Sequence, residues 1–135
     1  MKKNLSNEII FYNEATSIPI DVLNSVIMKK PKKQEHNLQV SIINYLRLNK
    51  IFCFAVPNGG SRNAREGANL KKEGVMAGVS DLIILLPNKA IFVEIKTDKG
   101  RQQETQKLFE EKVKGLGFDY LVWRNIDDAI RFIQN

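Results

Sequence analysis

The chain has 135 residues, 43% of them hydrophobic, which suffices for one compact domain with its own core and is too little for two. Its 21 Lys and Arg against 15 Asp and Glu give a formal net charge of +6, which favours polyanionic partners such as nucleic acid. The single cysteine, Cys53, excludes a disulfide framework within one chain, and no apolar run reaches the ~18 residues that cross a bilayer, so we expect a cytoplasmic domain with no membrane segment.

Residues 1–33 show no sustained hydrophobic period and end in the basic run Lys29-Lys30-Pro31-Lys32-Lys33. Basic runs of this kind are usually solvated linkers, although such a run can also contact phosphate. We interpret residues 1–33 as an N-terminal extension to a domain that spans residues 34–135.

The first part of that domain is predicted to be a helix, a strand and a loop. From Gln34 to Asn49 apolar residues recur at helical spacing, which predicts an amphipathic helix with Glu35 in its first turn. Ile51 to Val56 then reads as a short buried strand, and Pro57-Asn58-Gly59-Gly60 ends it with a strong turn signal. The polar stretch from Ser61 to Glu73 is predicted to be a loop, with at most a short helix.

Two strands joined by a tight turn follow. Asp81 to Leu86 is a continuous apolar run behind one acid, typical of a strand buried on both faces, and Pro87-Asn88-Lys89 turns the chain into a second strand from Ala90 to Lys96. Such a short connection predicts an antiparallel hairpin. Because strand side chains alternate, Glu94 and Lys96 share one face.

The C-terminal third is predicted to be a helix from Gln102 to Lys114, a strand from Phe118 to Arg124 and a closing helix from Asp127 to Ile133. The residues of the first of these helices that we expect to face the core are Leu108, Phe109 and Val113. The order of elements along the whole domain indicates an α/β fold with a central mixed sheet flanked by helices.

Asp81, Glu94 and Lys96 are the residues on which a chemical function can be built. Hairpin pairing can bring all three to one end of the sheet, at the polar ends of strands that are otherwise heavily apolar. Two converging carboxylates suit a hard cation such as Mg²⁺, which takes one or two protein carboxylates plus substrate phosphate. A lysine beside the metal can then prepare the attacking water or stabilise charge in the transition state.

These residues resemble a known signature. Asp81 followed by Glu94-x-Lys96 on the next strand resembles the PD-(D/E)xK nucleases, and this likeness implies a restriction-endonuclease-like fold. From Gln34 onward the chain resembles, more closely, the VRR-NUC domain family. The pieces that carry the closer resemblance are Glu35 with Gln39, Pro57 to Gly60, Gly74 to Asp81, Val93 to Lys96, Gln106, and Val122-Trp123-Arg124.

The resemblance implies a phosphodiesterase that uses Mg²⁺ or Mn²⁺. Lys96 would assist the nucleophilic water, and Gln106 would pack or hydrogen-bond beside it. Glu35 would reach the metal directly or through water, although an acid in a first helical turn can equally be a partner of the helix dipole. The implied catalytic residues are Asp81, Glu94, Lys96, Glu35 and Gln106, and the implied metal ligands are Asp81, Glu94, Glu35 and the backbone carbonyl of Ile95.

The contact with DNA is expected around the glycine turn, where four cations gather and glycines permit close approach of a phosphate backbone. The residues of this predicted surface are Asn58, Gly59, Gly60, Arg62, Arg65, Lys71 and Lys72. We expect the lone histidine, His36, at the surface. Tyr120 and Trp123 could stack on bases, but alternation in the strand favours a core position for at least one of them.

Three functions remain open from the sequence. The first is an endonuclease for branched or structured DNA, because short members of the resembling family are similar to Holliday-junction resolvases, and a two-fold symmetric substrate would fit a homodimer. The second is a nucleic-acid-binding module that has lost hydrolysis, although such a module has no need of two acids facing a phosphate. The third, a hydrolase of small phosphoesters, is disfavoured because the chain has no phosphate-cradling Gly-Lys-Ser/Thr motif.

Overall fold

The computed structural model describes residues 2–5, 8–11, 31–57 and 63–135, and the chain divides into two compact units, Met1–Gln34 and Glu35–Asn135. The first unit contains a two-stranded antiparallel sheet made of β1 (Lys2–Leu5) and β2 (Glu8–Phe11). The hydrophobic pattern does not predict these strands, because four residues are too few to establish an alternation.

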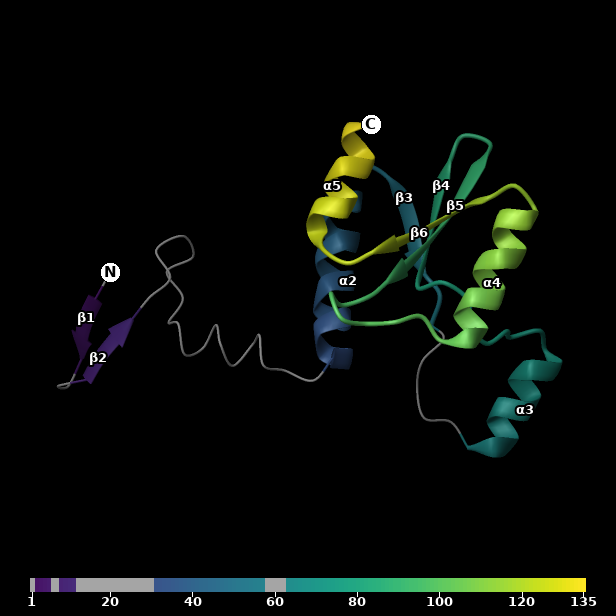
Figure 1. The fold of residues 1–135 in the computed structure, drawn as a ribbon, viewed down its shortest axis with the longest axis horizontal. Coiled ribbons are helices and arrows are strands. Elements are labelled where there is room, and N and C mark those ends of the chain that lie inside the picture. Colours follow the sequence, from purple (N-terminus) through teal and green to yellow (C-terminus); the bar gives the residue numbers. More distant parts are fainter. Residues whose placement is uncertain (1, 6–7, 12–30, 58–62) are drawn as a thin grey trace. The chain divides into compact units, whose positions relative to one another are not determined.

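The second unit is built on a four-stranded mixed sheet in the order β3-β4-β5-β6 (Figure 1). The strands are β3 (Phe52–Ala55), β4 (Leu82–Leu86), β5 (Lys89–Ile95) and β6 (Asp119–Trp123). β3, β4 and β5 pair antiparallel, whereas β5 and β6 pair parallel. The sheet confirms the predicted α/β fold class.

The hairpin between β4 and β5 is tighter than its predicted three-residue turn. Leu86 pairs with Lys89, so only Pro87 and Asn88 form the connection. Asn88 has a φ of 58°, a left-handed conformation that asparagine tolerates better than most residues. The turn fixes the register of the two strands that carry the predicted site.

The described residues hold four helices: α2 (Pro31–Leu48), α3 (Ala64–Lys72), α4 (Glu104–Gly115) and α5 (Ile126–Gln134). α2 begins at Pro31 rather than Gln34, because proline is compatible with the first turn of a helix. Glu35 therefore lies beyond the first turn, and its interpretation as a first-turn partner of the helix dipole is wrong. α3 is the short helix that the prediction allowed within the polar stretch from Ser61 to Glu73, and Asn63 caps it by accepting from the Glu66 N–H.

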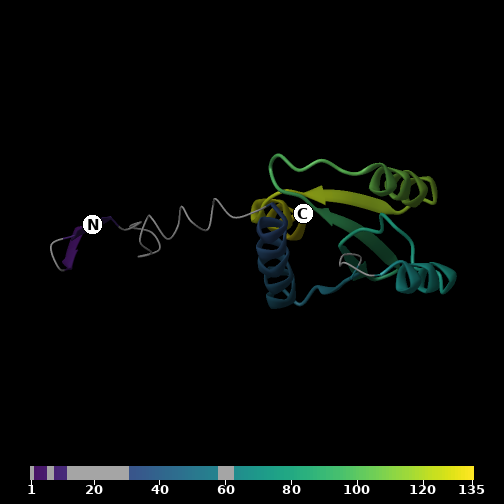
Figure 2. The ribbon, with the colours of Figure 1, turned by 90° about the horizontal axis from the view of Figure 1, so that it is seen from below.

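α2 and α5 cover one face of the sheet, and α4 covers part of the other (Figures 1 and 2). On the first face Trp123 packs against Phe132 of α5, with ring centroids 5.5 Å apart. On the second face Phe92 meets Phe109 of α4 edge-on at 5.6 Å. The buried residues of the main core are Ile42, Leu46, Cys53, Leu82, Ile84, Ile91, Val93, Ile95, Trp123 and Ala129.

Burial tests several of the predictions. The strand predicted from Ile51 to Val56 is present as β3, but its assignment as a buried strand is wrong, because only Cys53 is buried in this edge strand while Phe52, Phe54 and Ala55 are exposed. Val113 is buried and Phe109 half-buried, as predicted, but Leu108 is 58% exposed, so its assignment to the core is wrong. It lies about 100° around the helix from Phe109, which turns it away from the sheet. Trp123 and Tyr120 are both buried, and His36 is exposed, as predicted. Among the described residues, no helix is long and apolar enough to cross a membrane.

Candidate active site

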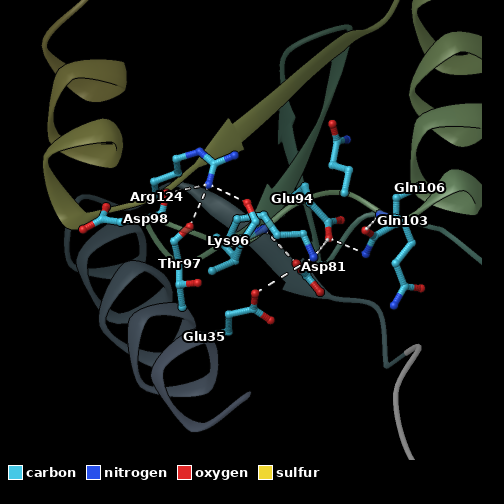
Figure 3. Close-up of polar contacts among 12 residues, drawn as sticks. Glu35, Asp81, Glu94, Lys96, Thr97, Asp98, Gln103, Gln106 and Arg124 are labelled. Atoms are coloured by element: carbon cyan, nitrogen blue, oxygen red, sulfur yellow. Dashed lines mark hydrogen bonds and ion pairs between the residues drawn. The ribbon is translucent and has the colours of Figure 1, made fainter. Parts of the chain in front are cut away.

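Asp81 and Glu94 come together because β4 and β5 pair in register. Leu82 pairs with Val93, so Asp81, just before β4, lies beside Glu94 at the end of β5. The backbone N–H of Ile95 donates to Asp81 Oδ2 at 2.7 Å, which fixes the carboxylate against the neighbouring strand. The two predicted acids therefore occupy one end of the sheet (Figure 3).

Glu94 is a buried carboxylate with one oxygen saturated and one without a partner. Its side chain is only 1% exposed. Oε1 accepts from Gln106 Nε2 at 2.7 Å and lies 3.3 Å from Lys96 Nζ. Oε2 has no hydrogen-bond partner in the part of the chain that the structure describes. Buried polar atoms without partners are rare and point to an unsatisfied requirement at that position.

The side-chain amide of Gln106 is oriented by the start of its own helix. Its Oε1 accepts from the backbone N–H of Gln103 at 2.8 Å, so Nε2, the donor end, is directed at Glu94 (Figure 3). The sequence places Gln106 beside Lys96, whereas the described contact joins it to Glu94. Gln106 thereby binds Glu94 Oε1, and Oε2 is the oxygen without a hydrogen-bond partner among the described residues.

Burial weakens the ionisation of both acids, and for Glu94 the negative charge of Asp81 adds to that effect. Burial, followed by the negative charge of Asp81, raises the pKa of Glu94 to about 7, although Lys96 opposes the shift. Burial also raises the pKa of Asp81, although the Ile95 N–H, the charge of Lys96 and the neighbouring Glu94 carboxyl all act to lower it. The pair is therefore electrostatically strained when both groups are ionised, and a cation between them would relieve that strain.

Lys96 and Glu35 complete the cluster. Lys96 is buried, and its Nζ lies 3.3 Å from Glu94 Oε1 and 4.0 Å from Glu35 Oε1. Glu35 comes from α2, far from β5 in the sequence, and its side chain is about one-third exposed. The first helix thus contributes an acid near the lysine, and the implied role of Glu35 at a metal stays a prediction.

Arg124 is a residue to which the sequence assigns no role, and it holds the loop that follows Lys96. Its Nη1 donates to the carbonyl oxygens of Thr97 at 2.7 Å and Gly100 at 2.8 Å, with Asp98 O at 3.4 Å (Figure 3). The backbone N–H of Arg124 donates to Asp128 Oδ2 at 2.8 Å. In the sequence, Arg124 stands out only as part of Val122-Trp123-Arg124. That motif does not indicate that the arginine binds the carbonyl oxygens of a loop more than 20 residues away.

Gly78 explains why the segment before Asp81 is rich in glycine. Its φ is +87°, and a Cβ there would lie 2.2 Å from the Thr105 carbonyl oxygen. The bare backbone lets the segment that leads to Asp81 pack against the first turn of α4, the same turn that presents Gln106. Gly78 therefore joins the segment before Asp81 to the helix whose Gln106 binds Glu94.

The predicted DNA surface is described only in part. Asn58, Gly59, Gly60 and Arg62 lie outside the described residues. The other members, Arg65, Lys71 and Lys72, lie on α3, which has no buried residue and stands on the same side of the sheet as α4 (Figures 1 and 2). No ion pair joins these three cations to an acid within the described part of the chain.

A mixed sheet with two acids and a lysine on adjoining strands is the arrangement of the restriction-endonuclease-like nucleases, and this chain has that fold. It belongs to the VRR-NUC domain family, whose profile matches residues 21–125. The match confirms the resemblance read from the sequence and begins upstream of Gln34, where that resemblance starts. The chain is therefore a nuclease-family domain, of a class that acts on nucleic acid.

Solved structures of VRR-NUC domains are similar to the chain, and two of them are compared with it. One, described as a VRR-NUC domain protein, is 26% identical, with a TM-score of 0.61, over 74% of this chain and 84% of its own. The other, described as a VRR-NUC domain, shares the fold at 18% identity, with a TM-score of 0.55, over 75% of this chain and 95% of its own. No curated protein matches the chain.

Proposed function

We propose that this domain is an Mg²⁺- or Mn²⁺-dependent endodeoxyribonuclease that hydrolyses phosphodiester bonds in branched or otherwise structured DNA. The observation that carries the proposal is the unpartnered Oε2 of Glu94, buried beside the carboxylate of Asp81. A buried carboxylate costs free energy unless it is paired or binds a metal. A divalent cation would supply the partner that the described residues do not.

The donors available fit a hard cation better than a softer one. Among the described residues no group of three or more His, Cys, Asp or Glu is arranged to hold a metal ion. Two carboxylates, those of Asp81 and Glu94, would instead bind the cation, with the carbonyl of Ile95 beside them and Glu35 acting through water. Two carboxylates, a carbonyl and water are a set that Mg²⁺ accepts. When bound, the ion would polarise the phosphoryl oxygen and make its water more acidic.

The protein's own groups supply the rest of the chemistry. Lys96 is held 3.3 Å from Glu94 Oε1, so its ammonium group is fixed where negative charge would develop on the phosphate or on the attacking water. Gln106 keeps the Glu94 carboxylate in one orientation by donating to Oε1 at 2.7 Å. Lys96 and Glu94 are both buried, which excludes water that would otherwise screen the attraction between their charges.

DNA binding is assigned to α3 and to the glycine turn that precedes it. Arg65, Lys71 and Lys72 are exposed on a nine-residue helix, and phosphate contacts of this kind bind without reading sequence. Branched substrates and a homodimer remain proposals that rest on the family resemblance. A two-fold symmetric junction would be served by two copies of the site.

The test is cleavage of linear, nicked, flap and four-way-junction DNA with Mg²⁺, Mn²⁺ or EDTA, followed on gels. Asp81→Asn should abolish cleavage while folding and DNA binding persist, because it removes a ligand charge without removing volume. Lys96→Ala should still bind Mn²⁺ in calorimetry while turnover falls roughly 10² to 10³-fold. The matched controls are Asp98→Asn and Lys99→Ala, which remove an exposed acid and an exposed lysine from the next loop.

Two results would contradict the proposal. Equal cleavage by the parent and Lys96→Ala would make Lys96 an ordinary lysine. DNA binding without metal-dependent cleavage of any substrate would favour the binding-module alternative instead.

The basic helix has its own test. Neutralising Arg65, Lys71 and Lys72 to Gln should weaken binding to all sequences alike and reduce the slope of log Kd against log salt by up to ~3. The measurement is fluorescence anisotropy with one duplex at several salt concentrations. An unchanged slope would place the DNA surface elsewhere.

A further inference from the structure

The edge strand β3 presents two phenylalanines to solvent. Phe52 is 65% exposed and Phe54 is 39% exposed, although both belong to a regular strand. Their rings meet edge to face, with centroids 6.2 Å apart and planes inclined by 65°. Cys53 between them faces the core, so the alternation of the strand turns both rings outward. The two exposed rings offer flat apolar faces on which another aromatic group can pack.

The sheet register puts these rings on the face that carries the acids. Phe54 pairs with Ile83, and Ile83 pairs with Phe92, which contacts α4. Directly paired residues point to the same face, and Glu94 lies two residues beyond Phe92 on the same strand. Phe54 therefore shares the face of Glu94.

Phe54 is also close to the acids along the strand direction. The Val56 N–H donates to Asp81 O at 2.9 Å, so the next row of the sheet runs from Val56 through Asp81 to Glu94. Neighbouring rows on one face are ~7 Å apart, about two base steps of DNA. A base stacked on Phe54 would thus belong to a nucleotide within about two steps of a phosphate placed at the acids.

The charge around β3 suits a polyanion. The segment 47–72 contains β3 and the residues on both sides of it. It holds six of the chain's 21 Lys and Arg but only one of its 15 Asp and Glu, so its net charge is +5 out of +6 for the chain. α3, within this segment, stands on the side of the sheet that α4 covers (Figures 1 and 2). The aromatic pair and the basic segment together match a ligand with anionic linkages and flat aromatic groups.

We infer that Phe54, buttressed by Phe52, is a stacking platform for an unpaired nucleobase beside the scissile phosphodiester. The inference rests on the proposed nuclease function. Because the rings are inclined by 65°, a base can lie parallel to only one of them, and Phe54 is the ring nearer the acids. A base inside a duplex hides its faces in the stack, so the platform selects substrates with an unpaired nucleotide at the cleavage site, such as a flap, fork or gap.

The experiment compares DNA affinities in EDTA, where no cleavage occurs. Fluorescence anisotropy is measured with a fully paired duplex, the same duplex carrying a single-stranded gap, and the isolated strand. The parent should prefer the two unpaired DNAs, and Phe54→Ala should weaken them roughly 5- to 100-fold while duplex affinity stays constant. Phe54→Trp should keep the preference. Phe54→Leu, which retains apolar volume without an aromatic face, should lose the preference as well. It replaces Phe54→Ala in the test if Phe54→Ala folds poorly.

The control is Leu116→Ala, which removes an apolar side chain that is 77% exposed at the far end of α4. It should leave all three affinities unchanged. Three outcomes overturn the platform: a parent with no preference, an equal loss on all three DNAs, or light scattering that shows Phe54→Ala converting a dimer to a monomer, which would make β3 a contact between copies. Failure of metal-dependent cleavage, by contrast, leaves the binding preference intact and counts against the nuclease function alone.

Discussion

Glu94→Gln should make the metal-free protein more stable, because it removes a charge whose burial costs more free energy than its contacts with Lys96 and Gln106 return. Burial and the charge of Asp81 hold the Glu94 pKa at about 7, against 4.5 for a free glutamate. A raised folded-state pKa in an acid means that no penalty exists well below pH 4.5, that it grows between pH 4.5 and 7, and that it is complete above pH 7. At 1.36 kcal/mol per pKa unit the penalty is about 1 kcal/mol at pH 5 and about 3 kcal/mol at pH 8.

The assay is urea unfolding of the parent and Glu94→Gln in EDTA at pH 5 and pH 8, followed by circular dichroism. The variant should gain about 2 kcal/mol more at pH 8 than at pH 5, since Gln keeps an oxygen for the Gln106 amide but has no charge to bury. Adding Mg²⁺ or Mn²⁺ at pH 8 should then stabilise the parent and leave the variant unchanged.

Glu111→Gln is the matched control, because Glu111 is an exposed glutamate on α4. The difference in free energy of unfolding between Glu111→Gln and the parent should be the same at pH 5 and pH 8. If Glu94→Gln shows the same difference from the parent at both pH values, Glu94 is not strained by ionisation and the electrostatic argument for a cation at this site is wrong.

Two further substitutions test the supports of the site. Arg124→Ala should lower the free energy of unfolding by roughly 1–3 kcal/mol and speed amide exchange at residues 97–100, because three carbonyl oxygens lose their charged donor. Arg124→Lys should restore part of that loss. Unchanged exchange would show that the loop holds itself. Gly78→Ala should cost roughly 2 kcal/mol or more in urea unfolding, because its Cβ would collide with the Thr105 carbonyl, whereas Gly67→Ala, with open space on α3, should gain up to ~1 kcal/mol. Equal effects of the two glycine substitutions would refute the close packing at Gly78.

The sequence alone determined the strands of the four-stranded sheet and the acids at the ends of two of them. An apolar run such as Leu82 to Leu86 is long enough to predict a strand, and the polar residue before it stands out because a buried charge is costly. The alternation from Ile91 to Lys96 likewise places Glu94 and Lys96 on one face without knowledge of any partner. These features depend on the properties of single segments, and the structure changes their bounds by only one or two residues.

The elements without a strong local pattern were decided by the rest of the molecule. α3 has no buried residue, so its hydrophobic pattern does not distinguish it from a loop, and its cap at Asn63 is the stronger local signal. Leu108 carries an apolar side chain at a helical position, but the sheet takes Phe109 and Val113 instead. Helical spacing gives the angle between two side chains and does not say which of them meets the core.

The partners of the candidate site were decided only by tertiary structure. Gln106 meets Glu94, and Arg124 meets the loop from Thr97 to Gly100, across 12 and more than 20 residues of sequence. The unpartnered Oε2 of Glu94 is likewise a property of everything packed around it. Periodicity reports how one segment divides its surface between core and solvent, whereas a hydrogen bond between distant side chains depends on how separate elements are placed, and that placement is fixed by the packing of the whole sheet and its helices.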